Sequence, residues 1–343
     1  MHVCILGAGG LGSLIGARLA EAGTDVTLIG REAHVAAIRS NGLRVEGIRG
    51  PSVVHQHLEA VTDAAQVAVP IDYLLVTVKA ADTADALTGA DMLRTTSRAA
   101  LSLQNNVTKD ARLAAWIGDA NVIGAATTES AALLGPGRVR HTGTAPVAFY
   151  FGEPDGRDSV RVADLVAAFR GAGFGCAATD SIAAVEWEKL LQAALIATFS
   201  ITAVGFLPDR TITDALQTRP GAEYYVQLAR ELLSVYRALG FTPQDYFAPY
   251  AQFRQMATED VESSVERTLQ LGRSMAGNGV RGKPSMHDDL LRGRRTEVDE
   301  SIGEFVRAAE RLGVAAPALL GAYRIVCGYQ ALMTEEAPVD VHP

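Results

Sequence analysis

The chain has 343 residues, of which 48% are hydrophobic and 20% charged, a composition typical of globular proteins that bury a core. Its 39 acidic residues outnumber its 31 lysines and arginines, for a formal net charge of −8, which argues against nucleic acid or an acidic membrane surface as the main partner. The length is sufficient for two domains.

The chain begins with a strand–turn–helix pattern. An apolar run at 3–6 leads into Gly7, Gly9 and Gly12, and an Ala/Leu-rich helical pattern follows over 13–22. This is the spacing of a dinucleotide-binding turn, in which the first glycine permits the turn, the second admits the pyrophosphate and the third lets the helix pack closely. The free N–H groups of the new helix would face the phosphates. The alternative is a glycine-rich turn without a ligand.

The end of the second strand, 25–29, carries no acidic residue. An acid at this position would accept hydrogen bonds from the ribose hydroxyls of NAD and repel a 2′-phosphate. The chain has Arg31 instead, whose guanidinium suits a phosphate. The sequence therefore predicts a preference for NADP(H), with a solvated loop charge as the alternative role of Arg31.

Helical and strand patterns continue to alternate as far as residue 178. We expect helices at 32–41, 81–93 and 158–172, and strands at 43–45, 52–55, 72–78, 99–103, 121–125, 139–141, 145–152 and 175–178. The strand at 121–125 would complete a parallel sheet, and the two strands between 139 and 152 would close the domain as antiparallel strands.

Polar residues follow two of these strands at their carboxyl ends, where open α/β sheets bind ligands. Lys79 is a candidate contact to the cofactor phosphates, and a surface loop lysine is the alternative. Asn105 is a candidate to hydrogen-bond both the nicotinamide ribose and the substrate. Asn106 is explained by a turn, since asparagine tolerates positive φ, and we expect His141 to be a packed strand histidine.

Strand signals vanish beyond about residue 179. Helical spacing is found over 182–204, 221–239, 243–265, 295–312 and 317–333, with an irregular passage at 277–284. We therefore predict an α/β, Rossmann-type NADP-binding domain at 1–179 and a mostly α-helical substrate domain at 180–343.

Two passages of the helical part concentrate groups that could do chemistry. Lys189 lies in an otherwise apolar helix and shares a face with Ala193 and Ala197 at a spacing of four. A second, charged passage runs from 284 to 299, for which a solvated charged turn is the alternative.

The chain resembles the ketopantoate reductase (2-dehydropantoate 2-reductase) family over nearly its full length. The resemblance rests on motifs in a shared order: Gly7-Ala8-Gly9-Gly10-Leu11-Gly12, Arg31, Val76-Thr77-Val78-Lys79-Ala80, Leu103-Gln104-Asn105, Pro136-Gly137, Trp187-Glu188-Lys189-Leu190, Pro284-Ser285-Met286 with Asp289, and Gly293-Arg294-Arg295-Thr296-Glu297. It implies NADPH-dependent reduction of the ketone of a 2-oxo acid, 2-dehydropantoate in the family, and a homodimer.

The resemblance also implies roles for individual residues. Lys189 matches the general acid, which would protonate the alkoxide left by hydride transfer. The residues implied as cofactor contacts are Gly7, Ala8, Gly9, Gly10, Leu11, Gly12, Arg31, Lys79, Asn105, Ala131 through its backbone, and Glu297. Those implied to line the substrate are Asn105, Lys189, Ala193, Ala197 and Ser285.

The chain departs from the family where the substrate would bind. The family has asparagines four and eight residues after the lysine, and this chain has Ala193 and Ala197. Alanine forms no side-chain hydrogen bonds, so a less polar pocket is expected. A more apolar 2-oxo acid or an imine is therefore an alternative substrate. A non-catalytic NADP(H) sensor and a dehydrogenase oxidising an amine or alcohol are further alternatives.

Cysteine usage and the apolar runs bear on location. Cys4, Cys176 and Cys327 are far apart in apolar surroundings, which is typical of buried free thiols in a reducing compartment rather than of a disulfide or metal framework. The first apolar run is only a strand long, and the run at 193–207 is too short to span a bilayer. We therefore expect a cytoplasmic protein without a bound metal.

Overall fold

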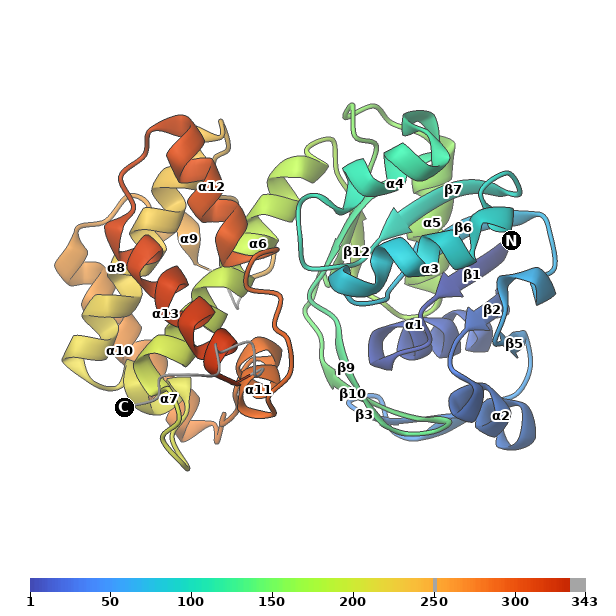
Figure 1. Cartoon of the computed structure of the whole chain (residues 1–343), viewed down its shortest axis with the longest axis horizontal. Coiled ribbons are helices and arrows are strands. Elements are labelled where there is room, and N and C mark those ends of the chain that lie inside the picture. Colours follow the sequence, from blue (N-terminus) through green and yellow to red (C-terminus); the bar gives the residue numbers. More distant parts are fainter. Residues whose placement is uncertain (249–251, 334–343) are drawn as a thin grey trace, which may run out of the picture. The chain divides into compact units, whose positions relative to one another are not determined.

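The computed structural model describes residues 1–248 and 252–333 (Figure 1). Contacts within the chain divide it into two compact units: Met1–Lys189 joined by residues 247–248, and Leu190–Tyr246 with the described residues from 252 onward. The division falls inside helix α6 (Ile182–Phe199). The domain boundary expected at 179–180 stays a prediction.

The first unit is built on a five-stranded, all-parallel sheet in the order β5-β2-β1-β6-β7 (Figure 1). The strand order reverses at β1, between β2 and β6, and ligands of doubly wound sheets bind at such a switch point. This confirms the α/β class predicted from the alternating patterns. The strands are β1 (His2–Leu6), β2 (Asp25–Ile29), β5 (Leu58–Val61), β6 (Ile71–Val76) and β7 (Ser97–Ser102).

Each face of this sheet is buried against an apolar core, because most residues of its strands are apolar. Val3 and Ile5 of β1 point into one core, whereas Cys4 and Leu6 point into the other, as the two-residue period of a strand requires. The first core includes residues of α1 (Gly10–Glu21), α2 (Glu32–Asn41) and α5 (Val160–Gly171), and the second includes residues of α3 (Thr83–Gly89) and α4 (Lys109–Ile117).

Helix α1 is buried along nearly its whole length, which explains its Ala/Leu-rich composition. One side packs on the parallel sheet and the other on a second sheet, β4-β3-β10-β9. A third sheet has the order β12-β11-β8. These strands are β3 (Leu43–Gly47), β4 (Ser52–Val54), β8 (Gly124–Thr127), β9 (Ser130–Gly135), β10 (Arg138–Gly143), β11 (Phe149–Gly152) and β12 (Cys176–Ala178).

Several strand expectations need correction. Strands β5 and β9 were not predicted. The strand expected at 121–125 does not complete the parallel sheet: only Val122 makes an isolated parallel bridge, to Ala100, and β8 pairs antiparallel with β11. Strand β10 pairs parallel with β3 and antiparallel with β9. The sequence did not show the β8–β11 and β10–β3 pairings because they join strands that are distant along the chain. Strand β9 forms a hairpin with β10, but it is mostly exposed and lacks the alternating pattern of a strand.

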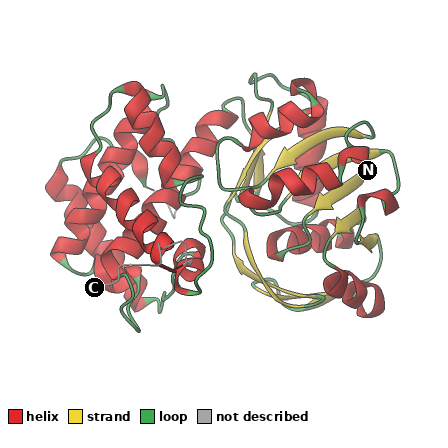
Figure 2. Ribbon diagram, in the orientation of Figure 1, coloured by secondary structure: helices red, strands yellow, loops and turns green. Residues whose placement is uncertain are grey.

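The second unit is helical throughout its described regular structure, as Figure 2 shows. Helix α8 packs against α7, α10, α12 and α13. The elements are the end of α6, a π-helical turn at Ser200–Val204, α7 (Ile212–Leu216), α8 (Arg219–Ala238), α9 (Phe253–Met256), α10 (Val261–Gly277), α11 (Ser285–Leu291), α12 (Ile302–Leu312) and α13 (Pro317–Met333).

The helix expected over 243–265 is not continuous: residues 243–248 are not helical, and only α9 and the start of α10 fall within the range; residues 249–251 lie outside the described residues. Asp245 adopts a φ of 57°, which interrupts a right-handed helix, and its side chain accepts a hydrogen bond from the Arg254 N–H. After the short helix α9, longer regular helix resumes at α10, where the Asp260 side chain accepts a hydrogen bond from the Ser263 N–H. Helix α12 likewise begins at Ile302 rather than at 295.

The described residues also bear on thiols, metals and membranes. Cys4 and Cys176 are buried free thiols as expected, whereas Cys327, also free, is only half-buried. In the described part of the chain, no three histidine, cysteine or acidic side chains gather as metal ligands would. None of the helices described there has the length and apolar composition of a membrane span.

Candidate functional site

The glycine turn joins β1 to α1, and its first glycine is required by backbone geometry. Gly7 has a φ of 116°, and a β-carbon there would lie 2.7 Å from the Val78 nitrogen. The N–H groups of Gly7 and Ala8 donate to the carbonyl of Ile29, at 3.1 and 2.9 Å. The turn is therefore held between the ends of β1, β2 and β6.

The next position, Gly9, faces open space. A β-carbon at Gly9 would meet nothing within 4 Å, and its φ of −82° is accessible to any residue. Gly9 is also the N-cap of α1, whose first turn has neither a side-chain cap nor an acidic residue. Uncapped helix N–H groups beside an open glycine fit the approach of a phosphate.

The last two glycines of the motif are tightly enclosed. A β-carbon at Gly10 would lie 2.4 Å from the Ala131 carbonyl oxygen on β9, and one at Gly12 would lie 2.3 Å from the Gly7 oxygen. Thr77 contacts the same place, since its hydroxyl donates to the Gly7 oxygen at 2.8 Å. The backbone of Ala131 thus lies at the start of α1, next to the glycine turn.

Arg31 and Lys79 flank this turn. Arg31 is the exposed N-cap residue of α2, directly after Gly30, where a β-carbon would lie 2.7 Å from that of Ala8. Lys79 is exposed just beyond β6, next to the Val78 residue that packs on Gly7. The structure therefore brings both cations to the same edge of the sheet as the glycine turn.

A histidine that sequence reasoning overlooked braces this edge. His34 of α2 is buried; its Nδ1 accepts from the Gly137 N–H at 3.0 Å, and its Nε2 lies 3.0 Å from the Ser13 hydroxyl. Burial lowers the pKa of His34, so the ring is neutral and its Nε2–H donates to Ser13. Its partners are 21 and 103 residues away along the chain, so the sequence carried no signal of this role.

Asn105 is exposed in the loop after β7, and its neighbours fix that loop. Gln104 donates from Nε2 to the Val78 oxygen at 2.8 Å and to the Thr83 hydroxyl at 2.7 Å. Asn106 is buried and its Oδ1 accepts from the N–H of Thr108 at 3.2 Å. Asn106 does not adopt positive φ, so its role is this side-chain turn rather than a left-handed backbone.

Lys189 is a half-buried residue of α6. Its ammonium makes no hydrogen bond or ion pair with the described residues. Burial lowers its pKa from the usual 10.5 to about 8, with no charged neighbour contributing to the shift. An unpaired, poorly solvated ammonium is costly to keep, and such groups are concentrated at functional sites.

The side chains that continue the Lys189 face differ from the expected set. Ala193 is half-buried, but Ala197 is only 4% exposed. Ile196 is half-buried instead, so Lys189, Ala193 and Ile196 form the more open stripe of this helix. Gln192 on the neighbouring face is buried, and its side-chain oxygen has no hydrogen-bond partner. The stripe after Lys189 is therefore apolar, as expected.

Ser285 and Glu297 lie on the second unit. Ser285 is the exposed first residue of α11, and His287 two residues later is buried, with Nδ1 2.7 Å from the Ser200 hydroxyl and Nε2 2.9 Å from the Gly205 oxygen. Glu297 is half-buried before α12, next to Thr296, whose N–H donates to the Gln330 side chain at 2.9 Å. Hydrogen bonds of the nearby residues His287 and Thr296 therefore fix the backbone that carries Ser285 and Glu297.

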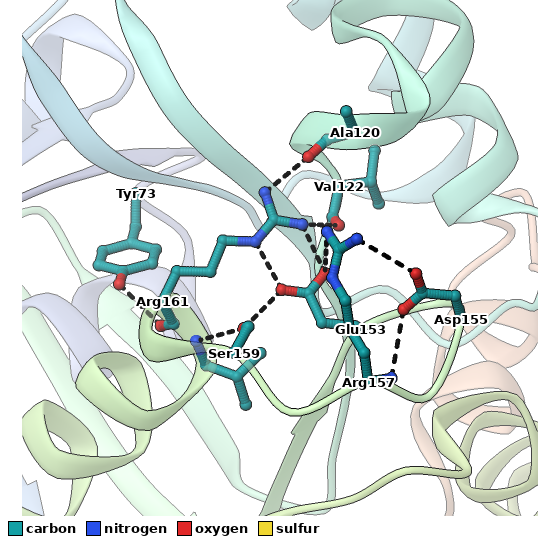
Figure 3. Close-up of polar contacts among 9 residues, drawn as sticks. Tyr73, Ala120, Val122, Glu153, Asp155, Arg157, Ser159 and Arg161 are labelled. Atoms are coloured by element: carbon teal, nitrogen blue, oxygen red, sulfur yellow. Dashed lines mark hydrogen bonds and ion pairs between the residues drawn. The ribbon is translucent and has the colours of Figure 1, made fainter.

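A second polar cluster of the first unit is structural (Figure 3). Glu153 accepts from Arg161 and from the Ser159 hydroxyl, at 2.6 Å each, while Arg161 also donates to the Ala120 oxygen. The Tyr73 hydroxyl donates to the Arg161 oxygen. Tyr73 lies in the amino-terminal half of β6, away from the strand ends that carry the glycine turn. Through Arg161 the cluster joins helix α5 to Glu153, which follows β11, and to Ala120, which precedes β8.

His141 shows no catalytic environment. It is buried on β10, with Nε2 2.8 Å from the Glu129 Oε1, and burial lowers the pKa of its ring. Both side chains are closed to solvent. This agrees with a packed strand histidine.

The chain matches known proteins along nearly its full length. The model of the ketopantoate reductase PanE/ApbA family matches residues 3–156, and that of its C-terminal part matches 181–330. A 2-dehydropantoate 2-reductase of Halobacterium salinarum is 32% identical over 320 residues, which cover 93% of this chain and 95% of that protein.

Solved structures share the architecture. A PanE/ApbA family ketopantoate reductase from Ralstonia eutropha JMP134 has a TM-score of 0.76 at 27% identity, over 97% of this chain and 99% of that one. A D-mandelate dehydrogenase, solved with NADH and anilino(oxo)acetate, has a TM-score of 0.75 at 20% identity over 97% and 99% of the two chains. At 20% identity, the likeness to the D-mandelate dehydrogenase shows a shared fold only.

Proposed function

Because the chain belongs to the ketopantoate reductase family, we propose that it reduces the ketone of a 2-oxo acid, 2-dehydropantoate, to the 2-hydroxy acid with NADPH, and that Lys189 is the general acid. The observation that carries the proposal is the unpaired, partly desolvated ammonium of Lys189.

Lys189 has the properties that carbonyl reduction needs. When a ketone is reduced, negative charge develops on its oxygen, and this charge needs a proton or a cation at once. A lysine with a pKa of about 8 is mostly protonated at neutral pH yet releases its proton more readily than an ordinary lysine. Because no carboxylate of the described chain pairs with Lys189, its charge and proton are available to a substrate.

The dinucleotide would be held by the glycine turn of the first unit. The open side of Gly9 and the uncapped start of α1 fit a pyrophosphate, and Gly10, Ala8 and Leu11 belong to the same turn. Lys79 supplies a further positive charge there. A bound nicotinamide supplies the hydride. By their place in the family's motifs, Asn105 and Glu297 are assigned to the cofactor, and Asn105 and Ser285 to the substrate.

The preference for NADPH rests on Arg31. The same fold holds NADH in the D-mandelate dehydrogenase structure, so the fold alone does not choose between the two cofactors. Arg31 is exposed at the end of β2, where an acidic residue would select NADH, and its guanidinium is free to bind a 2′-phosphate.

The apolar stripe after Lys189 favours a second candidate substrate class. Ala193 and Ile196, which are half-buried, cannot bind a substrate hydroxyl. A site without a partner for that hydroxyl discriminates weakly against substrates that lack it. We therefore keep more apolar 2-oxo acids, or an imine, as alternatives to 2-dehydropantoate.

The test is an NADPH-oxidation assay over a panel of 2-oxo acids that includes 2-dehydropantoate and branched and aromatic members, run also in reverse with the hydroxy acids. Turnover of at least one 2-oxo acid with NADPH supports the proposal. NADPH binding without turnover of any member would indicate a sensor, and faster turnover of amines or alcohols with NADP⁺ would indicate an oxidising dehydrogenase.

A further inference from the structure

We propose that the buried ion pair between Lys109 of α4 and Glu186 of α6 positions Asn105 and Lys189 relative to each other for the reaction. The inference rests on the proposed function, since it concerns residues assigned to that site. It makes Lys109 and Glu186 positioning residues, not catalytic ones.

The pair is enclosed by protein. The side chains of Lys109 and Glu186 are 2% and 8% exposed. The Lys109 ammonium contacts Glu186 Oε1 and also Asp110 Oδ1 at 2.8 Å, and Glu186 Oε1 accepts the Ala125 N–H of β8 at 3.0 Å. Three segments that are distant in sequence thus meet at one carboxylate.

The Lys109 end of the pair controls the Asn105 loop. Lys109 is the first residue of α4, and the Asn106 side chain folds the loop directly before it through Thr108. Gln104 fastens the other side of Asn105 to the segment after β6. Asn105 is therefore held from both sides, and Lys109 fixes the start of the helix that follows it.

The Glu186 end of the pair controls the start of α6. Glu186 precedes Lys189 by three residues, so the two lie on adjacent turns of one helix. The first residue of that helix, Ile182, packs where β8 and β11 carry the paired glycines Gly124 and Gly152; a β-carbon on either would come within 3.0 Å of Ile182. The helix is seated by this contact and held by the ion pair.

A buried ion pair is a weak source of stability, because desolvation offsets most of its Coulomb energy. Burial raises the pKa of Glu186 against the opposing effect of Lys109. Apolar residues of similar size often hold packed elements together as well as such a pair does, although the Ala125 N–H would lose its acceptor. What they would not supply is a fixed, directional connection between two loops and a helix, and a shift of about 1 Å at a catalytic group can cost about 100-fold in rate.

The experiment is a double-mutant cycle with Lys109→Met, Glu186→Leu and the apolar double variant Lys109→Met/Glu186→Leu. Glu153→Gln is the matched control, since it also removes a buried carboxylate that pairs with a cation of the first unit. For each variant we would measure kcat, the Kd of NADPH and the melting temperature, using the 2-oxo acid that the wild type reduces best.

We expect kcat to fall about 10- to 100-fold in each of the three variants, with the Kd of NADPH unchanged. The double variant should lose no more than a single one, because the two residues act as a unit. Glu153→Gln should lower the melting temperature while kcat is kept. The double variant leaves neither partner of the pair unpaired. If the single variants do not fold, the kcat of the double variant tests the inference.

The inference is overturned if the folded variants keep kcat within about two-fold of the wild type, or if kcat falls in Glu153→Gln as it does in them. It is also overturned if the single losses multiply in the double variant. A wild type that reduces no 2-oxo acid would instead refute the proposed function, so the two failures are distinguishable.

Discussion

Gly10 at the start of α1 lies directly against the Ala131 carbonyl of β9, so close that a β-carbon at Gly10 would be 2.4 Å from that oxygen. The neighbouring Gly9 has open space instead. The two glycines of one motif thus have different tasks: Gly10 lets a strand cross the helix, and Gly9 leaves room for a ligand.

This contrast gives the first prediction. Gly10→Ala should destabilise the protein by ~1–3 kcal/mol, since the backbone of β9 must move. Gly9→Ala, in open space with an accessible φ, should keep the melting temperature of the free protein while weakening NADPH binding. Thermal unfolding and NADPH titration of both variants check this. Equal melting losses in the two would contradict it.

Arg31→Glu should change the choice of cofactor. A charge-assisted hydrogen bond is worth ~1.5–3 kcal/mol, so the NADPH-to-NADH ratio of kcat/KM should fall roughly ten- to a hundred-fold. Arg112→Glu, at an exposed position of α4, is the control for net charge. An unchanged ratio in the Arg31 variant would mean that Arg31 is only a solvated loop charge.

The pH dependence of turnover should follow Lys189. A general acid acts in its protonated form, so kcat should be highest below about pH 8 and fall as the pH rises through that value. Initial rates between pH 6 and 10 at saturating substrates measure this. A kcat that is flat across the range would show that Lys189 is not the proton donor.

Replacing Lys189 should also affect stability, in a direction opposite to most core substitutions. Its pKa is lower in the folded chain than the usual 10.5, so its charge destabilises the fold in full below about pH 8, and this penalty disappears as the pH rises toward 10.5. Lys189→Met should therefore raise the melting temperature at pH 7 and gain little at pH 10. A lower melting temperature of Lys189→Met at pH 7 would contradict the inference that Lys189 carries an unpaired charge in the folded chain.

The Glu153 cluster predicts a separate acid sensitivity. Hydrogen bonds from Arg161 hold the pKa of Glu153 below its usual range. The ionised Glu153 side chain therefore stabilises the folded chain above about pH 4.3, and this stabilisation is lost as the pH falls below that value. Glu153→Gln should cost ~2 kcal/mol at pH 7 and much less at pH 3. Urea unfolding at both pH values checks the sign.

Ala193→Asn tests the substrate alternatives. An asparagine four residues after Lys189 would offer hydrogen bonds on the half-buried stripe. We expect kcat/KM for 2-dehydropantoate, which carries a hydroxyl, to rise relative to an apolar 2-oxo acid. Ala183→Asn, exposed near the start of the same helix, is the control. An unchanged ratio would place the substrate away from this stripe.

The local parts of the fold were predictable because their signals are local. The glycine turn, the polar residues after β6 and β7, and the lone lysine of α6 are each contained in a few consecutive residues. The second and third sheets were not, because β10 pairs with β3, and β8 with β11, across long separations. Strand β9 adjoins β10 in the chain, but it is mostly exposed and has no alternating apolar pattern.

The candidate site was predictable to the same extent. Ala131 was placed only by resemblance, and the structure shows why it matters for Gly10. The Lys109–Glu186 pair gave no sequence signal, since a lysine at a helix start and a glutamate in an amphipathic pattern usually face solvent. The open position of Ile196 in place of Ala197 depends on tertiary packing that helical spacing alone does not give.

The measurement that tests the account most directly is NADPH oxidation with 2-dehydropantoate and the 2-oxo-acid panel, for the wild type and Lys189→Ala side by side, with NADPH affinity measured for both. We expect turnover by the wild type, a kcat lower by ~10²–10⁴ in the variant, and equal NADPH affinity. Near-normal turnover by Lys189→Ala, or NADPH binding without turnover of any 2-oxo acid by the wild type, would contradict it.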